Sequence, residues 1–152
     1  MKKLMLKSKE KSSFKDEINK AELALRIDED DIDQEARFQP ILFAKFIKNF
    51  TKAYTLSRNL ELDVLQLKDN LAKDITKNPK SWGLKPNERI TDALINRIVV
   101  RDKDYSSLYK QWVEAKAQEK YWENMLKACE GRGYTVNKLF EMKVKQFMGQ
   151  EG

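Results

Sequence analysis

Two long apolar series, each advancing by alternating steps of three and four residues, limit what this chain can fold into. Steps of this size place side chains on one face of an α-helix and are typical of a coiled-coil seam. The first series predicts a helix from about residue 40 to about residue 76, with Pro40 in its first turn. Only Ser57 breaks this series, which comprises Phe43, Phe46, Phe50, Ala53, Ser57, Leu60, Val64, Leu67 and Leu71.

The second series predicts another long helix, over about residues 88–130, with Asn87 as its N-cap. Polar residues interrupt it at two positions, where they can fix register or oligomeric state. The charged stretch 101–104 leaves open whether this helix is continuous. The series comprises Leu94, Ile98, Arg101, Tyr105, Leu108, Trp112, Ala115, Glu119, Trp122, Leu126 and Cys129.

The glycines and prolines mark the ends of these helices. Residues 77–87 hold two of the three prolines and one of the five glycines, and therefore form a connection. Gly131 and Gly133 predict that the second helix stops there, with a glycine in a left-handed C-cap. A short amphipathic helix is expected over about residues 136–148. The expected fold is all-α: a long antiparallel helical hairpin over residues 38–130 and a C-terminal helix within residues 131–152.

The first 37 residues carry opposed blocks of charge. Residues 1–20 have a net charge of +4 and residues 21–37 a net charge of −5. We expect a charged, partly disordered arm that buries little. The acidic run 28–33 lacks the glycine and the glutamate of a calcium-binding loop, so a solvated segment is the main interpretation. Three others stay open: it imitates a nucleic-acid strand, binds a basic partner, or folds back on this protein's own basic face.

A hairpin of this kind has a thin core, because each helix buries one stripe. Several aromatic side chains would stay half exposed, and self-association through the apolar seam would cover them. We therefore expect a homo-oligomer, held mainly by its C-terminal half. The residues expected at this contact are Trp112, Trp122, Leu126, Leu139, Phe140 and Phe147.

The composition argues against an enzyme. The chain has no histidine, which removes the commonest general base and most zinc sites. Its single cysteine, Cys129, lies on the apolar stripe and is expected to be a small buried hydrophobe. No glycine-rich phosphate-binding motif is present, so neither a cofactor nor a metal is expected. No apolar run approaches the roughly 18 residues of a membrane span, and a cytoplasmic location is expected.

The basic residues allow two interpretations. Segment 38–86 has nine basic and four acidic residues, which suits either a solvated helix face or a surface that contacts phosphates. Trp82 lies between two lysines, where it could stack on a base or plug the end of the hairpin. The candidate DNA contacts are Lys68, Lys73, Lys77, Lys80, Lys85 and Trp82.

Residues 121–142 resemble the C-terminal part of the phage recombination mediators of the UvsY-like family. The pattern is a Tyr-Trp pair, a leucine, a cysteine, an Arg-Gly-aromatic step and a terminal amphipathic helix. Here it falls on Tyr121, Trp122, Leu126, Cys129, Arg132, Gly133, Tyr134 and Met142.

The resemblance implies a small all-helical protein that assembles into a ring, a hexamer or heptamer, in the bacterial host cytoplasm. Such mediators bind single-stranded DNA and contact both a RecA-like recombinase and the single-strand-binding protein. They help the recombinase to displace that protein and to start its filament, without covalent chemistry. The family's DNA-contacting residues lie on an upstream helix, where Lys68, Lys73 and Lys77 are the positional candidates.

Two other functions remain open. One is a non-catalytic coiled-coil scaffold whose charges only keep it in solution. The other is an inhibitor whose acidic segment, residues 28–35, occupies the DNA site of a partner protein.

Overall fold

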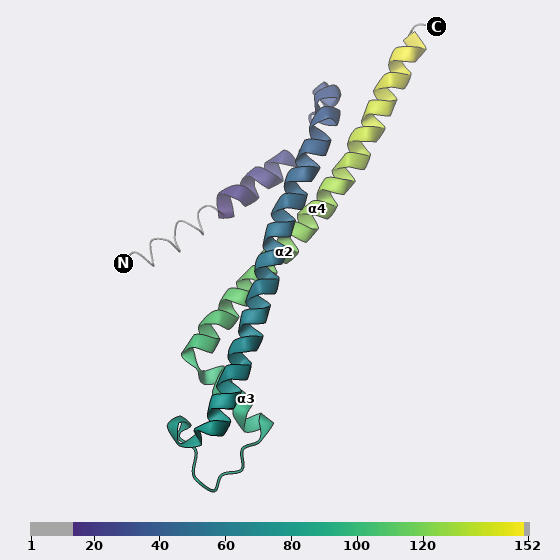
Figure 1. The fold of residues 1–152 in the computed structure, drawn as a ribbon. Coiled ribbons are helices and arrows are strands. Elements are labelled where there is room, and N and C mark those ends of the chain that lie inside the picture. The colour runs from purple at the N-terminus through teal and green to yellow at the C-terminus, as the bar shows by residue number, and fades with distance from the viewer. Residues whose placement is uncertain (1–13, 151–152) are drawn as a thin grey trace. The chain divides into compact units, whose positions relative to one another are not determined.

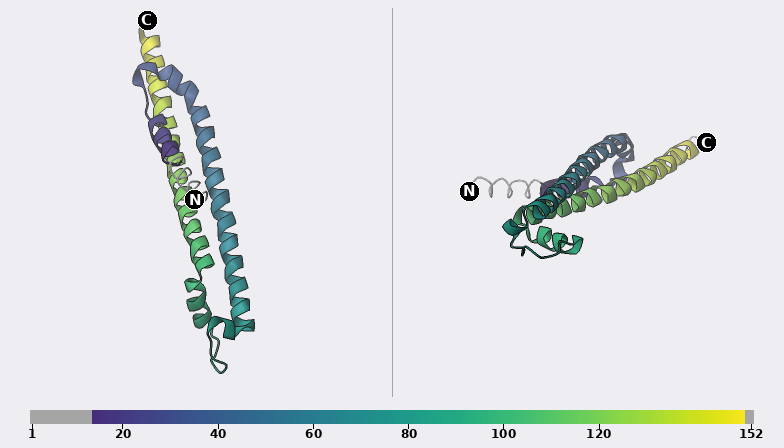
Figure 2. Two further views of the ribbon diagram at one scale, coloured as in Figure 1. Left: turned by 90° about the vertical axis from the view of Figure 1, so that its left-hand side faces the viewer. Right: turned by 60° about the horizontal axis from the view of Figure 1, so that its bottom comes forward.

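The computed structural model describes residues 14–150, which form helices and connections without any β-strand (Figure 1). The all-α prediction is confirmed for this part of the chain. A helix over residues 14–24 comes first, and the chain then turns back through residues 25–31 (Figure 2). The elements that follow are η1 (Glu29–Asp31), α2 (Ile32–Lys77), η2 (Pro79–Trp82), α3 (Asp92–Arg101) and α4 (Lys103–Gln150).

The described chain divides into two compact units. The first comprises the chain up to residue 50 together with the chain from residue 122 onward. Its core forms where the start of α2 packs on α4, and Phe46 meets Trp122 edge to face with ring centroids 5.9 Å apart. Leu42, Cys129 and Val136 are almost fully buried in the same unit. The arm also contributes to burial, since Ala21 and Ile32 are 6% and 4% exposed.

The second unit, residues 51–121, contains the rest of α2, the whole of α3 and the start of α4. Its buried apolar side chains are Ala53, Val64, Ile75, Val99 and Ala115. Ala53, Val64 and Ala115 belong to the two apolar series, Val99 follows Ile98 of the second series, and Ile75 lies one turn beyond the last member of the first. Ser57, which interrupts the first series, is also buried, at 1% exposed. The seam therefore continues through this serine without a break in packing.

Helix α2 begins eight residues before the predicted start, so Pro40 lies inside it and not in its first turn. A proline inside a helix removes one backbone hydrogen bond and crowds the preceding turn. Here the preceding turns are held from outside, because Asp33, Glu35 and Gln39 all bind side chains or backbone of α4. These long-range contacts outweigh the local signal of the proline.

The predicted second helix is split in two at Asp102. Its backbone is extended (φ −63°, ψ 132°), and its side chain accepts a 2.9 Å hydrogen bond from the Tyr105 N–H. Asp102 thus ends α3 and caps α4. The expected N-cap at Asn87 is wrong, because α3 starts later and is capped by the hydroxyl of Thr91, which accepts from the Leu94 N–H. The connection correspondingly spans residues 78–91 and contains η2.

The predicted helix end at Gly131 and Gly133 is also wrong. Helix α4 continues through both glycines to Gln150, so there is no separate C-terminal helix. Neither glycine adopts a positive φ. Gly133 serves a different purpose: a Cβ atom there would lie 2.9 Å from Nε2 of Gln39. This glycine allows the side chain of α2 to approach α4 closely.

Replacing the two glycines with alanine should separate these roles. Gly131→Ala meets no atom within 4 Å and should raise the free energy of unfolding by about 0.5–1 kcal/mol, because alanine suits a helix better. Gly133→Ala gains the same preference but displaces Gln39, so it should be less stable than Gly131→Ala by about 1–2 kcal/mol. Urea denaturation followed by circular dichroism, at one protein concentration, measures both. Equal stabilisation by the two substitutions would contradict the close approach.

Candidate functional site

A cluster of basic residues lies where α2 ends and α3 and α4 begin, all within the second unit. We call it the basic cluster. Four of its members are expected DNA contacts, namely Lys73, Lys77, Lys80 and Lys85, whereas the arginines of the connection and of α3 and the first lysine of α4 are not among those expected. Its eight members are Lys73, Lys77, Lys80, Lys85, Arg89, Arg97, Arg101 and Lys103, and all are exposed.

No described carboxylate forms an ion pair with a residue of the basic cluster. Within residues 14–150, none of the eight cations lies within ion-pair distance of a carboxylate. Residues 73–103 contain four acidic residues, and three of these accept hydrogen bonds from N–H groups. Asp74 accepts from the Trp82 indole, Glu88 from the Lys85 backbone and Asp102 from the Tyr105 backbone. The cations are consequently available to an external anion.

Trp82 is held in place at the end of α2. Its indole Nε1 donates to Oδ2 of Asp74 at 2.9 Å, while Nδ2 of Asn78 donates to Oδ1 of the same carboxylate at 3.0 Å. These two hydrogen bonds lower the pKa of Asp74. The carboxylate stays charged above its unfolded pKa, and its bonds to Trp82 and Asn78 are lost only as the pH falls through the lowered value. The ring is half-buried, and its orientation is fixed by Asp74.

The expected DNA contacts do not all share one face. Lys73 and Lys77 are one turn apart on α2, but Lys68 lies about 140° around the helix from Lys73 and is half-buried. Lys80 lies on η2 and Lys85 in the connection, both in the basic cluster.

Arg101 is expected from the sequence to be a polar interruption of a helical seam. The break at Asp102 instead makes it the last residue of α3. The charged run 101–104 indicates a place where the helix can break, but not which residue caps the next helix.

A second set of polar residues joins α2 to α4 inside the first unit. The guanidinium of Arg132 is 3% exposed, pairs with the Glu35 carboxylate, and donates to Oε1 of Gln39 at 2.6 Å and to the Arg26 carbonyl at 3.2 Å. Its Nε has no partner among the described residues. Burial lowers the pKa of Arg132, which nonetheless remains a cation. We call Arg132, Glu35 and Gln39 the buried polar network.

Gln39 extends this network to Cys129. Its Nε2 donates to the Cys129 carbonyl at 2.8 Å and approaches the sulfur at 3.7 Å. Cys129 is 0% exposed, and its burial raises the pKa of the thiol. A protonated, inaccessible thiol is a poor nucleophile. Arg132 and Gly133 therefore both have a structural role around Gln39, the first by donating a hydrogen bond to it and the second by leaving room for its side chain.

Part of the acidic segment is used within the chain. The Asp28 side chain caps η1, accepting from the Asp30 N–H at 3.0 Å. Asp33 binds Lys143 at 2.8 Å, and Glu35 belongs to the buried polar network. Two carboxylates of residues 28–35 thus fold back on cations of α4, while the carboxylates of η1 remain exposed.

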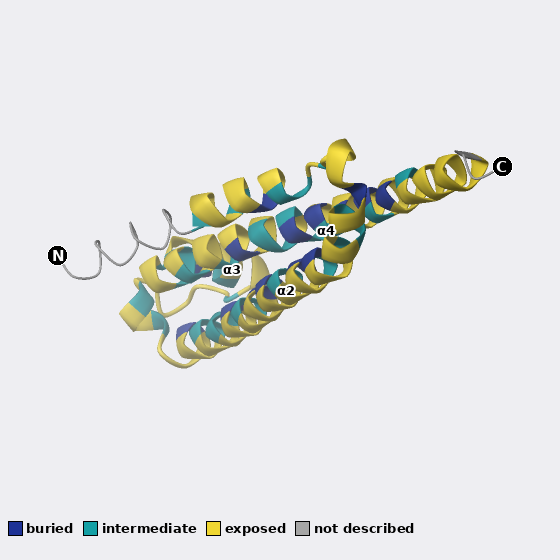
Figure 3. Cartoon of the chain, turned by 90° about the horizontal axis from the view of Figure 1, so that it is seen from above, coloured by how far each residue is buried: buried dark blue, intermediate teal, exposed yellow. Residues whose placement is uncertain are grey.

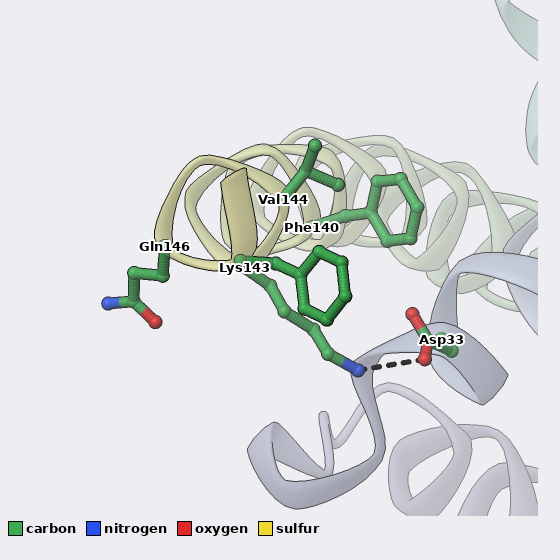
Figure 4. A pocket seen from close by; sticks show the side chains of 6 residues that line it. Asp33, Phe140, Lys143, Val144 and Gln146 are labelled. Carbon is green, nitrogen blue, oxygen red and sulfur yellow. Dashed lines mark hydrogen bonds and ion pairs between the residues drawn. The ribbon is translucent and has the colours of Figure 1, made fainter. Parts of the chain in front are cut away.

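The residues expected at an oligomer contact differ widely in exposure. Trp122 is buried against Phe46, and Trp112, Leu126 and Leu139 are half-buried. Phe140 and Phe147 are exposed, on the last turns of α4, where nearly every residue faces solvent (Figure 3). These two phenylalanines, with Val144, line a surface pocket of about 320 Å³ beside the Lys143–Asp33 ion pair (Figure 4).

In the described part of the chain, no cluster of three or more side chains could hold a metal ion, and none of the helices has the length and apolar character of a membrane span. Comparison of the chain with protein-family models, curated proteins and solved structures gives no match.

Removing Arg132 should destabilise the first unit strongly. Arg132→Ala leaves the largely buried Glu35 and Gln39 without their partner, which should cost about 3–5 kcal/mol of unfolding free energy. Lys143→Ala is the matched control, because it removes an ion pair between the same two helices whose side chains are 53% and 52% exposed, and it should cost less than about 1 kcal/mol. Urea denaturation measures both. A small, equal loss for the two variants would show that the buried polar network does not hold α2 on α4.

Proposed function

We propose that this chain is a recombination mediator. It binds single-stranded DNA and helps to load a RecA-like recombinase onto strand that is covered by single-strand-binding protein. The observation that carries the DNA-binding part is the basic cluster, whose eight exposed cations form no ion pair with any described carboxylate. The partner proteins are proposed from the resemblance of residues 121–142 to the UvsY-like family.

The basic cluster suits a flexible polyanion better than a small ligand. Its members come from the end of α2, from η2 and the connection after it, from α3 and from the start of α4, and all of them are exposed. Lysines and arginines on an open surface neutralise successive phosphates without reading bases. Binding of this kind depends strongly on salt and little on sequence, as a mediator of recombination requires.

Self-association is the second part of the proposal, together with the pairing of the long helices as a hairpin. Helix α4 ends in an exposed stripe of Phe140, Val144 and Phe147, and Leu139 flanks it. Contact between these stripes in neighbouring copies would remove apolar area from water. A closed ring would then bring several basic clusters onto one strand and convert weak contacts into avid binding.

A scaffold without DNA affinity is the second candidate, favoured by one observation. The apolar stripe at the end of α4 needs a protein partner whether or not DNA is present. In that case the chain would form an oligomer and the basic cluster would only be solvated. The two functions differ in DNA affinity at moderate salt, not in oligomeric state.

Reversing charges in the basic cluster should weaken DNA binding. Lys73→Glu/Lys77→Glu/Lys80→Glu should lower affinity for a labelled single-stranded oligonucleotide at least tenfold and reduce the slope of log affinity against log salt by about 0.7 per lost contact. Fluorescence anisotropy over a salt series measures both quantities.

The matched control is Lys45→Glu/Lys48→Glu/Lys52→Glu, three exposed lysines earlier on α2. It changes the net charge equally and should lower affinity much less, because it lies outside the basic cluster. Equal loss in both variants would mean that only net charge matters. Absence of binding by the wild type would favour the scaffold.

Charges placed in the C-terminal stripe should dissociate the oligomer. Phe140→Asp/Phe147→Asp buries two charges in the proposed contact and should reduce the molar mass in size-exclusion chromatography with light scattering, with helical content retained. Lys145→Asp is the control, since Lys145 is exposed on the opposite side of the same turns. A full-sized oligomer of the double variant would refute this contact.

A further inference from the structure

A row of aromatic side chains follows one flank of α4 in the second unit. Tyr105 and Tyr109 are stacked, with ring centroids 5.9 Å apart and planes at 26°. Tyr109 meets Trp112 edge to face, with centroids 5.5 Å apart and planes at 76°. The spacing of four and then three residues keeps these rings in a line along the helix. We call Tyr105, Tyr109 and Trp112 the aromatic row.

The aromatic row lies beside the core of its unit, with Tyr105 and Trp112 half-buried and Tyr109 exposed. The core-facing residue of these turns is Ala115, 3% exposed, and Tyr109 lies about 120° around the helix from it. Tyr109 is 43% exposed, and the neighbouring Val113 is 49% exposed. A ring that served only to fill the core would be covered by other side chains, as Trp122 is at 4% exposed.

A lysine accompanies the aromatic row. Lys116 places its Nζ 4.7 Å from the centroid of the Trp112 ring. Lys116 is exposed, and it forms no ion pair with a carboxylate of residues 14–150. Its charge is therefore held beside the rings by the cation–π contact and is not neutralised.

A second cation–aromatic pair lies on α2 in the same unit. The guanidinium of Arg58 is 4.9 Å from the centroid of Tyr54, which is 44% exposed. Arg58 also binds Glu119 of α4 at 3.4 Å, and Glu119 follows Lys116 by one turn. Tyr54 and Tyr109 are thus two exposed tyrosines on α2 and α4, the helices that the Arg58–Glu119 ion pair joins. A cation–aromatic pair lies at or beside each of them.

From this geometry we infer that the aromatic row and Lys116 form a base-stacking platform for single-stranded DNA. The inference deepens the proposed function and rests on it. Proteins that bind single strands without sequence preference combine a cationic surface with aromatic rings on which successive bases stack. Here the basic cluster would hold phosphates, and Tyr109, the most exposed ring of the row, would receive a base.

Charge favours a nucleic acid over a second copy of this chain as the occupant. Residues 51–121 hold fourteen basic and ten acidic residues, a surplus of +4 that a second copy would repel and a polyanion would neutralise. Packing another helix over the row would also desolvate the unpaired Lys116. The apolar stripe at the end of α4 offers a contact between copies without that cost.

Comparison of a normal and an abasic oligonucleotide tests the platform with the full-length protein. Both strands carry the same number of phosphates, so the basic cluster treats them alike, whereas only the normal strand can stack. We expect labelled oligothymidylate to bind about tenfold tighter than an abasic strand of equal length in fluorescence anisotropy. Tyr109→Ala should reduce this ratio at least fivefold while leaving affinity for the abasic strand unchanged.

Two further variants control for the ring and for general loss of a tyrosine. Tyr109→Phe retains the ring and should keep the ratio. Tyr134→Ala removes a tyrosine that is 79% exposed on α4 in the other unit, and it should also keep the ratio. Light scattering on every variant verifies that the oligomer is unchanged.

The outcomes separate this inference from the proposed function. A wild-type ratio near one, with both strands bound, would overturn the platform and leave phosphate binding intact. Failure to bind either strand would overturn both. A Tyr109→Ala variant that loses the oligomer and keeps the ratio would assign the aromatic row to a contact between copies and overturn the platform.

Discussion

The buried guanidinium of Arg132 is the interaction on which the first unit depends. A cation removed from water is tolerated only when its partners are in place, and here Glu35, Gln39 and the Arg26 carbonyl all come from the chain before and within the first turns of α2. The same contacts explain two departures from local preference. Helix α2 extends back past Pro40, and α4 continues through Gly133. Each feature is unfavourable by itself and follows from anchoring one charge.

Ion pairs and hydrogen bonds within each unit determine which charges remain free. Asp33 and Glu35 are neutralised by cations of α4, and in the second unit Asp74, Glu88 and Asp102 accept hydrogen bonds from N–H groups. A chain with a net charge of +6 therefore carries the exposed cations of the basic cluster next in sequence to four acids, three of which are engaged with N–H groups. Self-repulsion among such cations costs folding free energy, and bound phosphates would remove that cost. This is the physical reason to expect an anionic partner at the basic cluster.

Periodicity predicted what depends on local spacing. The seam residues Phe46, Ala53, Val64 and Trp122 are buried as the steps of three and four require, and even Ser57 keeps its place in the stripe. The helix ends were predicted less well, because they depend on partners distant in sequence. The local preference of glycine predicts a helix end at Gly133. In the structure the helix continues there, because the missing side chain leaves room for Gln39, which lies ninety-four residues earlier in the chain. Likewise Arg101 ends α3 because Asp102 breaks the helix, and four charged residues in a row do not say which of them will act as the cap.

The aromatic row and the basic cluster would give DNA binding two components with different responses to salt. Phosphate contacts weaken as counterions compete, with a slope of about 0.7 in log affinity per contact on a single strand. Stacking on Tyr109 displaces no counterion and is nearly insensitive to salt. A strand bound through both would stay attached by its bases as phosphate contacts exchange one by one. A protein that passes a strand from one partner to another needs this property, because the strand can be released in steps and never all at once.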